Sequence, residues 1–132
     1  LIEARIEANS KKLEGFLTKS MTDSIAAMFS PNCHMMVEYE PIIESEEKVR
    51  NYFAREQKSG KKISEYKLEP EEIKVYDEIA LEIGTAALEY TIPPDKKLYV
   101  KQYNYMFVWK ESKSGKYHIR AAMWNSPDDP CR

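Results

Sequence analysis

Residues 63–92 read ISEYKLEPEEIKVYDEIALEIGTAALEYTI, and this stretch decides the fold. Apolar and polar side chains alternate along most of it, which is the period of β-strands. The alternation breaks around Pro70, and we expect Gly84 to shift it again, so each of two adjacent strands would carry a bulge or kink. Because kinks in adjacent strands make a sheet curl, the stretch predicts a strongly bent antiparallel sheet.

Two further strands, residues 98–110 and 117–126, extend this sheet into a four-stranded meander. Ahead of it, the periodicity predicts helices over residues 1–19 and 23–29, an early strand over residues 33–39, and a third helix from the cap residue Ser45 to Gly60. Helices and sheet each have an apolar side to bury. The sequence thus predicts an α+β fold, a cone-shaped α+β barrel with three N-terminal helices packed on the bent sheet, and a pocket at its open mouth.

The length of 132 residues, with 42% hydrophobic and 32% charged residues, predicts one globular domain over residues 1–126 and a C-terminal tail over 127–132. A net charge of −2 gives no reason to expect nucleic acid as a partner. No apolar run is long enough to span a bilayer, so no membrane association is expected. Glu3, Arg5 and Glu7 interrupt the N-terminus, which is unlike a secretory signal, so we expect a cytoplasmic protein.

Metal ions and cofactors are not expected. His34, His118, Cys33 and Cys131 lack the spacing of metal ligands, and the two cysteines are expected to be free thiols. The four glycines are scattered singly, so there is no phosphate-binding loop, and no Gly-x-Ser-x-Gly nucleophile elbow occurs.

Five short motifs follow one another in a characteristic order: AAMFSPNC at residues 26–33, KVRNYF at 48–53, ALEIG at 80–84, VWK and GKYHI at 108–119, and MWNS at 123–126. Together they resemble the nuclear transport factor 2-like superfamily, and within it the SnoaL-like and ketosteroid-isomerase-like branch. The segment around residues 108–119 also resembles the association domain of calcium/calmodulin-dependent kinases, which has this fold but serves assembly. The resemblance therefore implies the architecture and leaves the activity open.

Ketosteroid isomerases use a carboxylate base together with a tyrosine and an acid that donate hydrogen bonds. In an ungapped comparison through Phe29, Leu13 stands at the donor tyrosine, Val37 at the base, and Tyr105 near the donor acid. Steroid isomerisation is therefore not expected. If the early strand is shifted by one or two residues, Glu38 or Glu40 replaces the base. Both acids share a side of this strand with Met36 and His34; if that side does not face inward, both are solvent-facing acids at the strand end.

The strand over residues 98–110 places an aromatic side chain at nearly every second position, which makes one aromatic face. This face is either the wall of the pocket and core or a dimer surface. The candidate catalytic residues are Glu38 and Tyr105, and the candidate ligand-binding residues are Met36, Tyr103 and Trp124. Glu82 is a further acid that either points inward or lies on an exposed strand face.

Two hypotheses remain open from the sequence. The first is a small pocketed domain that binds an apolar or carbonyl-containing small molecule, with acid–base catalysis of the isomerase or cyclase type as an option. The second is a non-catalytic homodimeric binding or assembly module. Ala122 stands where the family often has an aspartate, which favours the second.

Overall fold

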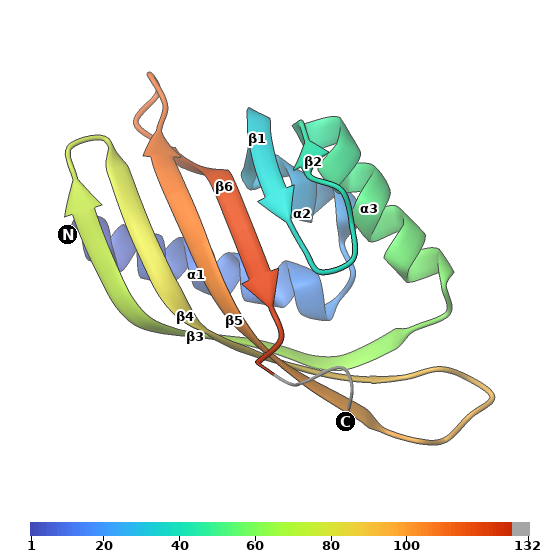
Figure 1. The fold of residues 1–132 in the computed structure, drawn as a ribbon. Helices are drawn as coiled ribbons and strands as arrows, with labels where there is room; N and C mark the ends of the chain where they lie inside the picture. Colours follow the sequence, from blue (N-terminus) through green and yellow to red (C-terminus); the bar gives the residue numbers. More distant parts are fainter. Residues whose placement is uncertain (128–132) are drawn as a thin grey trace.

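The computed structural model describes residues 1–127, so Cys131 and most of the expected C-terminal tail lie outside the described residues. The elements are α1 (Ile2–Thr18), α2 (Thr22–Ala27), β1 (Phe29–Met36), β2 (Ile43–Glu44), α3 (Glu46–Lys58), β3 (Lys62–Tyr76), β4 (Ile79–Thr91), β5 (Tyr99–Glu111) and β6 (Tyr117–Asn125). Helices pack against one sheet, which confirms the predicted α+β class (Figure 1). No helix in this part of the chain is long and apolar enough to cross a bilayer.

The sheet is mixed and open, in the order β2-β1-β6-β5-β4-β3. The expected antiparallel meander is formed by β3 to β6. The early strand β1, however, runs parallel to the last strand, β6, so the expectation of a purely antiparallel sheet was wrong. The reason is that a parallel pair needs a long crossover, and the whole segment between β1 and β6 supplies it.

The bend of the sheet comes from β3 and not from a phase shift in β4. The register of β3 against β4 shifts between Pro70 and Glu72, as the break in alternation predicted. In β4, by contrast, every second residue from Ala80 to Tyr90 is buried without interruption, so the expected phase shift at Gly84 was wrong. Figure 1 shows β3, β4 and β5 curving together along their length.

Gly84 has a different role, which is to allow a close approach. It pairs with Pro70, and a Cβ atom added to it would overlap the carbonyl oxygen of Glu69 and lie 2.8 Å from the Tyr105 hydroxyl. Only a residue without a side chain leaves room there for the bulged strand and for this tyrosine.

The helices lie where their apolar stripes require. α1 buries Ile6, Leu13 and Leu17 against the concave face of the sheet, as its spacing of three and four predicted. α3 begins after Ser45, whose hydroxyl accepts a hydrogen bond from the Lys48 amide at 3.3 Å. The aromatic face of β5 also points inward, since Tyr105, Phe107 and Trp109 are all buried; it is a core wall and not a dimer surface.

Replacing Gly84 with alanine should destabilise the protein by about 3 kcal/mol, because the new methyl group must displace backbone atoms of β3 and the Tyr105 hydroxyl. Gly15→Ala is the matched control. Nothing lies within 4 Å of the position of its added Cβ, and the residue is inside α1, so this substitution should stabilise the protein by about 0.8 kcal/mol. Urea denaturation measures both changes, and equal stabilities for the two variants would contradict the account of the bend.

Candidate functional site

A cavity of about 510 Å³ opens between the helices and the ends of the long strands. Its interior is formed by aliphatic and aromatic side chains from seven elements and the segment that follows β1: Leu17, Ile25, Val37, Tyr52, Phe53, Ile63, Tyr66, Leu88, Tyr103 and Trp124. A cavity of this size and composition suits a drug-sized, mainly apolar molecule.

Four tyrosines line the cavity, and three of them are partly buried: Tyr52 from α3, Tyr66 from β3 and Tyr103 from β5. Burial raises the pKa of each hydroxyl above its ordinary value of about 10, and each is further raised by its tyrosine neighbours. All three are therefore neutral near pH 7, and each can donate a hydrogen bond to a ligand.

Charged side chains line only the mouth. Glu56 is bonded to Lys61 at 3.2 Å, and the Lys61 ammonium also lies 4.8 Å from the centre of the Tyr90 ring. Glu38 accepts a hydrogen bond from the backbone amide of Ser126 and, among the described residues, has no ion-pair partner. Glu38 is thus the acid of the cavity wall that forms no ion pair with a described residue.

Three of the five predicted site residues, Glu38, Tyr103 and Trp124, line this cavity together. Glu38 reaches it because β1 ends at Met36 and the chain then turns, with Tyr39 at a φ of 64°; strand alternation, the basis of the prediction, does not place it there. Met36 lies on the outer face of the sheet, since the buried residues of β1 alternate through Cys33 and Met35. It is absent from the cavity wall.

Tyr105 is also absent from the cavity wall. Its hydroxyl donates to the fully buried carboxyl of Glu82 at 2.5 Å. The same carboxyl accepts hydrogen bonds from Ser10 of α1 at 2.5 Å and from the Trp109 indole at 3.0 Å. These four residues and Phe107 form what we call the packed end of the interior. Because this hydroxyl is engaged inside the core, the assignment of Tyr105 as a catalytic donor is withdrawn.

Burial raises the pKa of the Glu82 carboxyl, against the three hydrogen bonds, which lower it. Glu7, on the facing helix, raises it slightly further. The inward alternative for this acid is therefore the correct one, and its hydrogen bonds connect α1, β4 and β5.

Sequence reasoning missed Tyr52 and Tyr66 as site residues. Tyr52 belongs to the apolar stripe of α3, and Tyr66 lies two positions before the buried Leu68, so both were on inward-facing positions of recognisable elements. The sequence could have indicated them, since each is a tyrosine, with a hydroxyl group, at a position whose periodicity predicts an inward-facing side chain. Among residues 1–127, no group of three or more His, Cys, Asp or Glu side chains is arranged to hold a metal ion.

No protein-family model matches the sequence, and no curated protein matches it. Solved structures do match. A ketosteroid isomerase-like protein from Erwinia carotovora atroseptica superposes with a TM-score of 0.83 at 12% identity, covering 96% of both chains. A nuclear transport factor 2-like superfamily protein from Salmonella enterica gives 0.81 at 11% identity over 98% of this chain and 93% of that one.

A protein described as a putative calcium/calmodulin dependent protein kinase II association domain, from Xanthomonas campestris, gives a TM-score of 0.72 at 20% identity, covering 94% of this chain and 87% of that one. At these identities the likeness shows the fold alone. The chain has the nuclear transport factor 2-like fold, as the ordered motifs indicated. The SnoaL-like branch is not distinguished by these similarities.

The buried carboxyl predicts a specific pH dependence. Because the folded-state pKa of Glu82 is raised, the folded protein holds its proton more tightly than the unfolded chain does. The contribution of this carboxyl to the free energy of unfolding is fully present below the ordinary glutamate pKa of about 4.3. It is lost as the pH rises through the folded-state pKa, so the free energy of unfolding falls across that window.

In Glu82→Gln the side chain keeps its shape but cannot ionise, so this fall should disappear. Urea denaturation at a series of pH values measures it. Glu78→Gln, at an exposed position in the β3–β4 turn, is the control and should follow the wild type. If the free energies of unfolding of wild type and Glu82→Gln changed in parallel with pH, the raised pKa of Glu82 would be refuted.

Proposed function

We propose that this chain binds an uncharged, apolar or carbonyl-containing small molecule in the cavity between the helices and the sheet. The observation that carries the proposal is the composition of the 510 Å³ cavity, whose wall is largely aliphatic and aromatic and includes three neutral tyrosine hydroxyls. Such walls favour a ligand by burying its apolar surface, while the hydroxyls compensate for desolvating a carbonyl. The similarity of the fold to that of a ketosteroid isomerase-like protein is in keeping with this.

Acid–base catalysis is the finer part of the proposal. Glu38 is the lining acid without an ion pair among the described residues, and its charge acts on the hydroxyl of Tyr103, whose pKa it helps to raise. A carboxylate at the mouth can remove a proton from the carbon next to a carbonyl, while a tyrosine donates a hydrogen bond to the enolate oxygen that develops. Returning the proton to another carbon gives isomerisation, and returning it to the same carbon gives exchange.

The uncharged bicyclic ketone 2-tetralone in deuterium oxide tests binding and catalysis together. We expect the protein to bind it and to speed deuterium incorporation next to the carbonyl, followed by proton NMR. Glu38→Gln should keep the dissociation constant but lower the exchange rate at least about 100-fold, because the base is lost.

Glu56→Gln removes the other carboxylate at the mouth, the one paired with Lys61, and should keep the exchange rate. Leu88→Trp fills the cavity and should abolish binding. Binding without exchange above the solution rate would reject catalysis and leave the binding proposal standing. Equal binding by wild type and Leu88→Trp would reject the cavity as the site.

We propose homodimerisation through the outer face of the sheet as a second function, which is compatible with the first. Ile83, Met106, Met123 and Met36 are direct cross-strand neighbours on four adjacent strands, β4, β5, β6 and β1. Met106 and Met123 are 37% and 36% exposed, on the face opposite α1. This row, flanked by polar Asn104 and Asn125, could pack against its own copy across a two-fold axis.

Met106→Glu should weaken such a dimer at least about 100-fold, because a charge would be buried without a partner at the centre of the interface. Ala8→Glu introduces the same charge on the exposed side of α1 and is the control. Sedimentation velocity over a concentration series measures the dissociation constant. A monomeric wild type at millimolar concentration would eliminate this proposal.

A further inference from the structure

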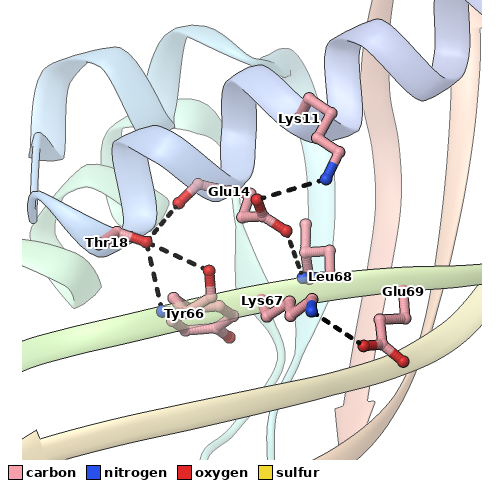
Figure 2. A network of polar contacts seen from close by, with 7 residues as sticks. All are labelled: Lys11, Glu14, Thr18, Tyr66, Lys67, Leu68 and Glu69. Carbon is pink, nitrogen blue, oxygen red and sulfur yellow. Dashed lines mark hydrogen bonds and ion pairs between the residues drawn. The ribbon is translucent and has the colours of Figure 1, made fainter.

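Helix α1 contacts both the amide and the carbonyl group of the Tyr66 backbone. The Thr18 hydroxyl oxygen lies 3.3 Å from the Tyr66 amide nitrogen, which donates to it, and 3.2 Å from the Tyr66 carbonyl oxygen (Figure 2). Two residues further along, the Leu68 amide donates to the Glu14 carboxylate at 2.8 Å. β3 is an edge strand, and these contacts occupy backbone groups that β4 does not pair. The tyrosine ring therefore enters the cavity from a fixed point.

Trp124 supplies a second constraint, on the hydroxyl end of the same side chain. It is only 7% exposed, and within the described residues its indole N–H makes no hydrogen bond of normal geometry. Trp124 and Tyr66 line the same cavity, and the indole lowers the pKa of the Tyr66 hydroxyl, against burial, the larger cause, which raises it. An indole N–H can only donate, so a hydroxyl beside it takes the acceptor role.

The direction of the Tyr66 proton follows from this arrangement. A hydroxyl group whose oxygen faces a hydrogen-bond donor points its own hydrogen in another direction. Beside Tyr66, that direction is the cavity. Tyr66 is also the tyrosine of the cavity wall whose backbone is hydrogen-bonded to Thr18 of α1. A ligand oxygen that reaches it is removed from water and cannot replace its lost hydrogen bonds by other means.

We propose that Tyr66 is the specificity-determining hydrogen-bond donor of the cavity, positioned by Thr18 and Trp124, and that it selects uncharged ligands with a carbonyl oxygen over hydrocarbons of the same shape. This inference rests on the proposed binding function and adds which side chain recognises the ligand. Trp124 acts on the ligand through Tyr66 and is a positioning residue.

The test compares 9-fluorenone with fluorene, two rigid tricyclic molecules that differ mainly in the carbonyl group. Isothermal titration calorimetry gives the two dissociation constants and hence the preference for the ketone. In Tyr66→Phe this preference should fall about fivefold or more, while the affinity for fluorene stays the same. Unchanged fluorene affinity also shows that the variant is folded and its cavity intact.

Tyr52→Phe and Tyr103→Phe are matched controls, since each removes one hydroxyl from the same cavity, and both should keep the wild-type preference. Trp124→Phe should lower the preference in the same direction as Tyr66→Phe. The infrared carbonyl band of bound 9-fluorenone gives an independent readout: it should move to higher frequency in Tyr66→Phe and part of the way in Trp124→Phe.

The outcomes separate the two proposals. If both molecules bind and Tyr66→Phe keeps the wild-type preference and carbonyl frequency, the role of Tyr66 is overturned while the binding function stands. A loss of preference in Tyr103→Phe or Tyr52→Phe alone would also overturn it. If neither molecule binds to the wild type, the proposed function itself fails, and the inference fails with it.

Discussion

The carboxyl of Glu82 fixes one half of the interior, and the other half depends on it. Its hydrogen bonds to Ser10, Tyr105 and Trp109 connect the first helix to two neighbouring strands at a point where Glu82 is fully buried. The Tyr105 hydroxyl reaches this carboxyl beside Gly84, where a side chain would occupy its place. The bend of the sheet and the hydrogen bonds of the packed end thus depend on each other through Gly84 and Tyr105.

The same two strands build both halves of the interior. Along β5, Tyr103 lies in the cavity wall, and the next inward residues, Tyr105, Phe107 and Trp109, fill the packed end. Along β4, Leu88 lines the cavity and Glu82 belongs to the packed end. A fully engaged carboxyl and close-packed rings fill one end of the interior, and the cavity of about 510 Å³ lies at the other.

Local sequence patterns predicted the elements well, because each depends on nearby residues. The break at Pro70 and the cap at Ser45 were visible, and the structure confirms both. The phase of β4 was misassigned because Leu81 and Ile83 make its outer face apolar, which hides the alternation. The parallel contact of β1 with β6 and the turn that carries Glu38 into the cavity depend on segments about 90 residues apart, which periodicity does not connect.

The chain has two tryptophans, one in each half of the interior, and they provide the most direct test of a divided interior. The measurement is a titration of the ¹⁵N-labelled protein with 9-fluorenone, following the two indole N–H signals by NMR. The account predicts that the Trp124 signal moves with ligand concentration, while the Trp109 signal, held by Glu82, stays in place. Movement of the Trp109 signal alone, or equal movement of both, would contradict it.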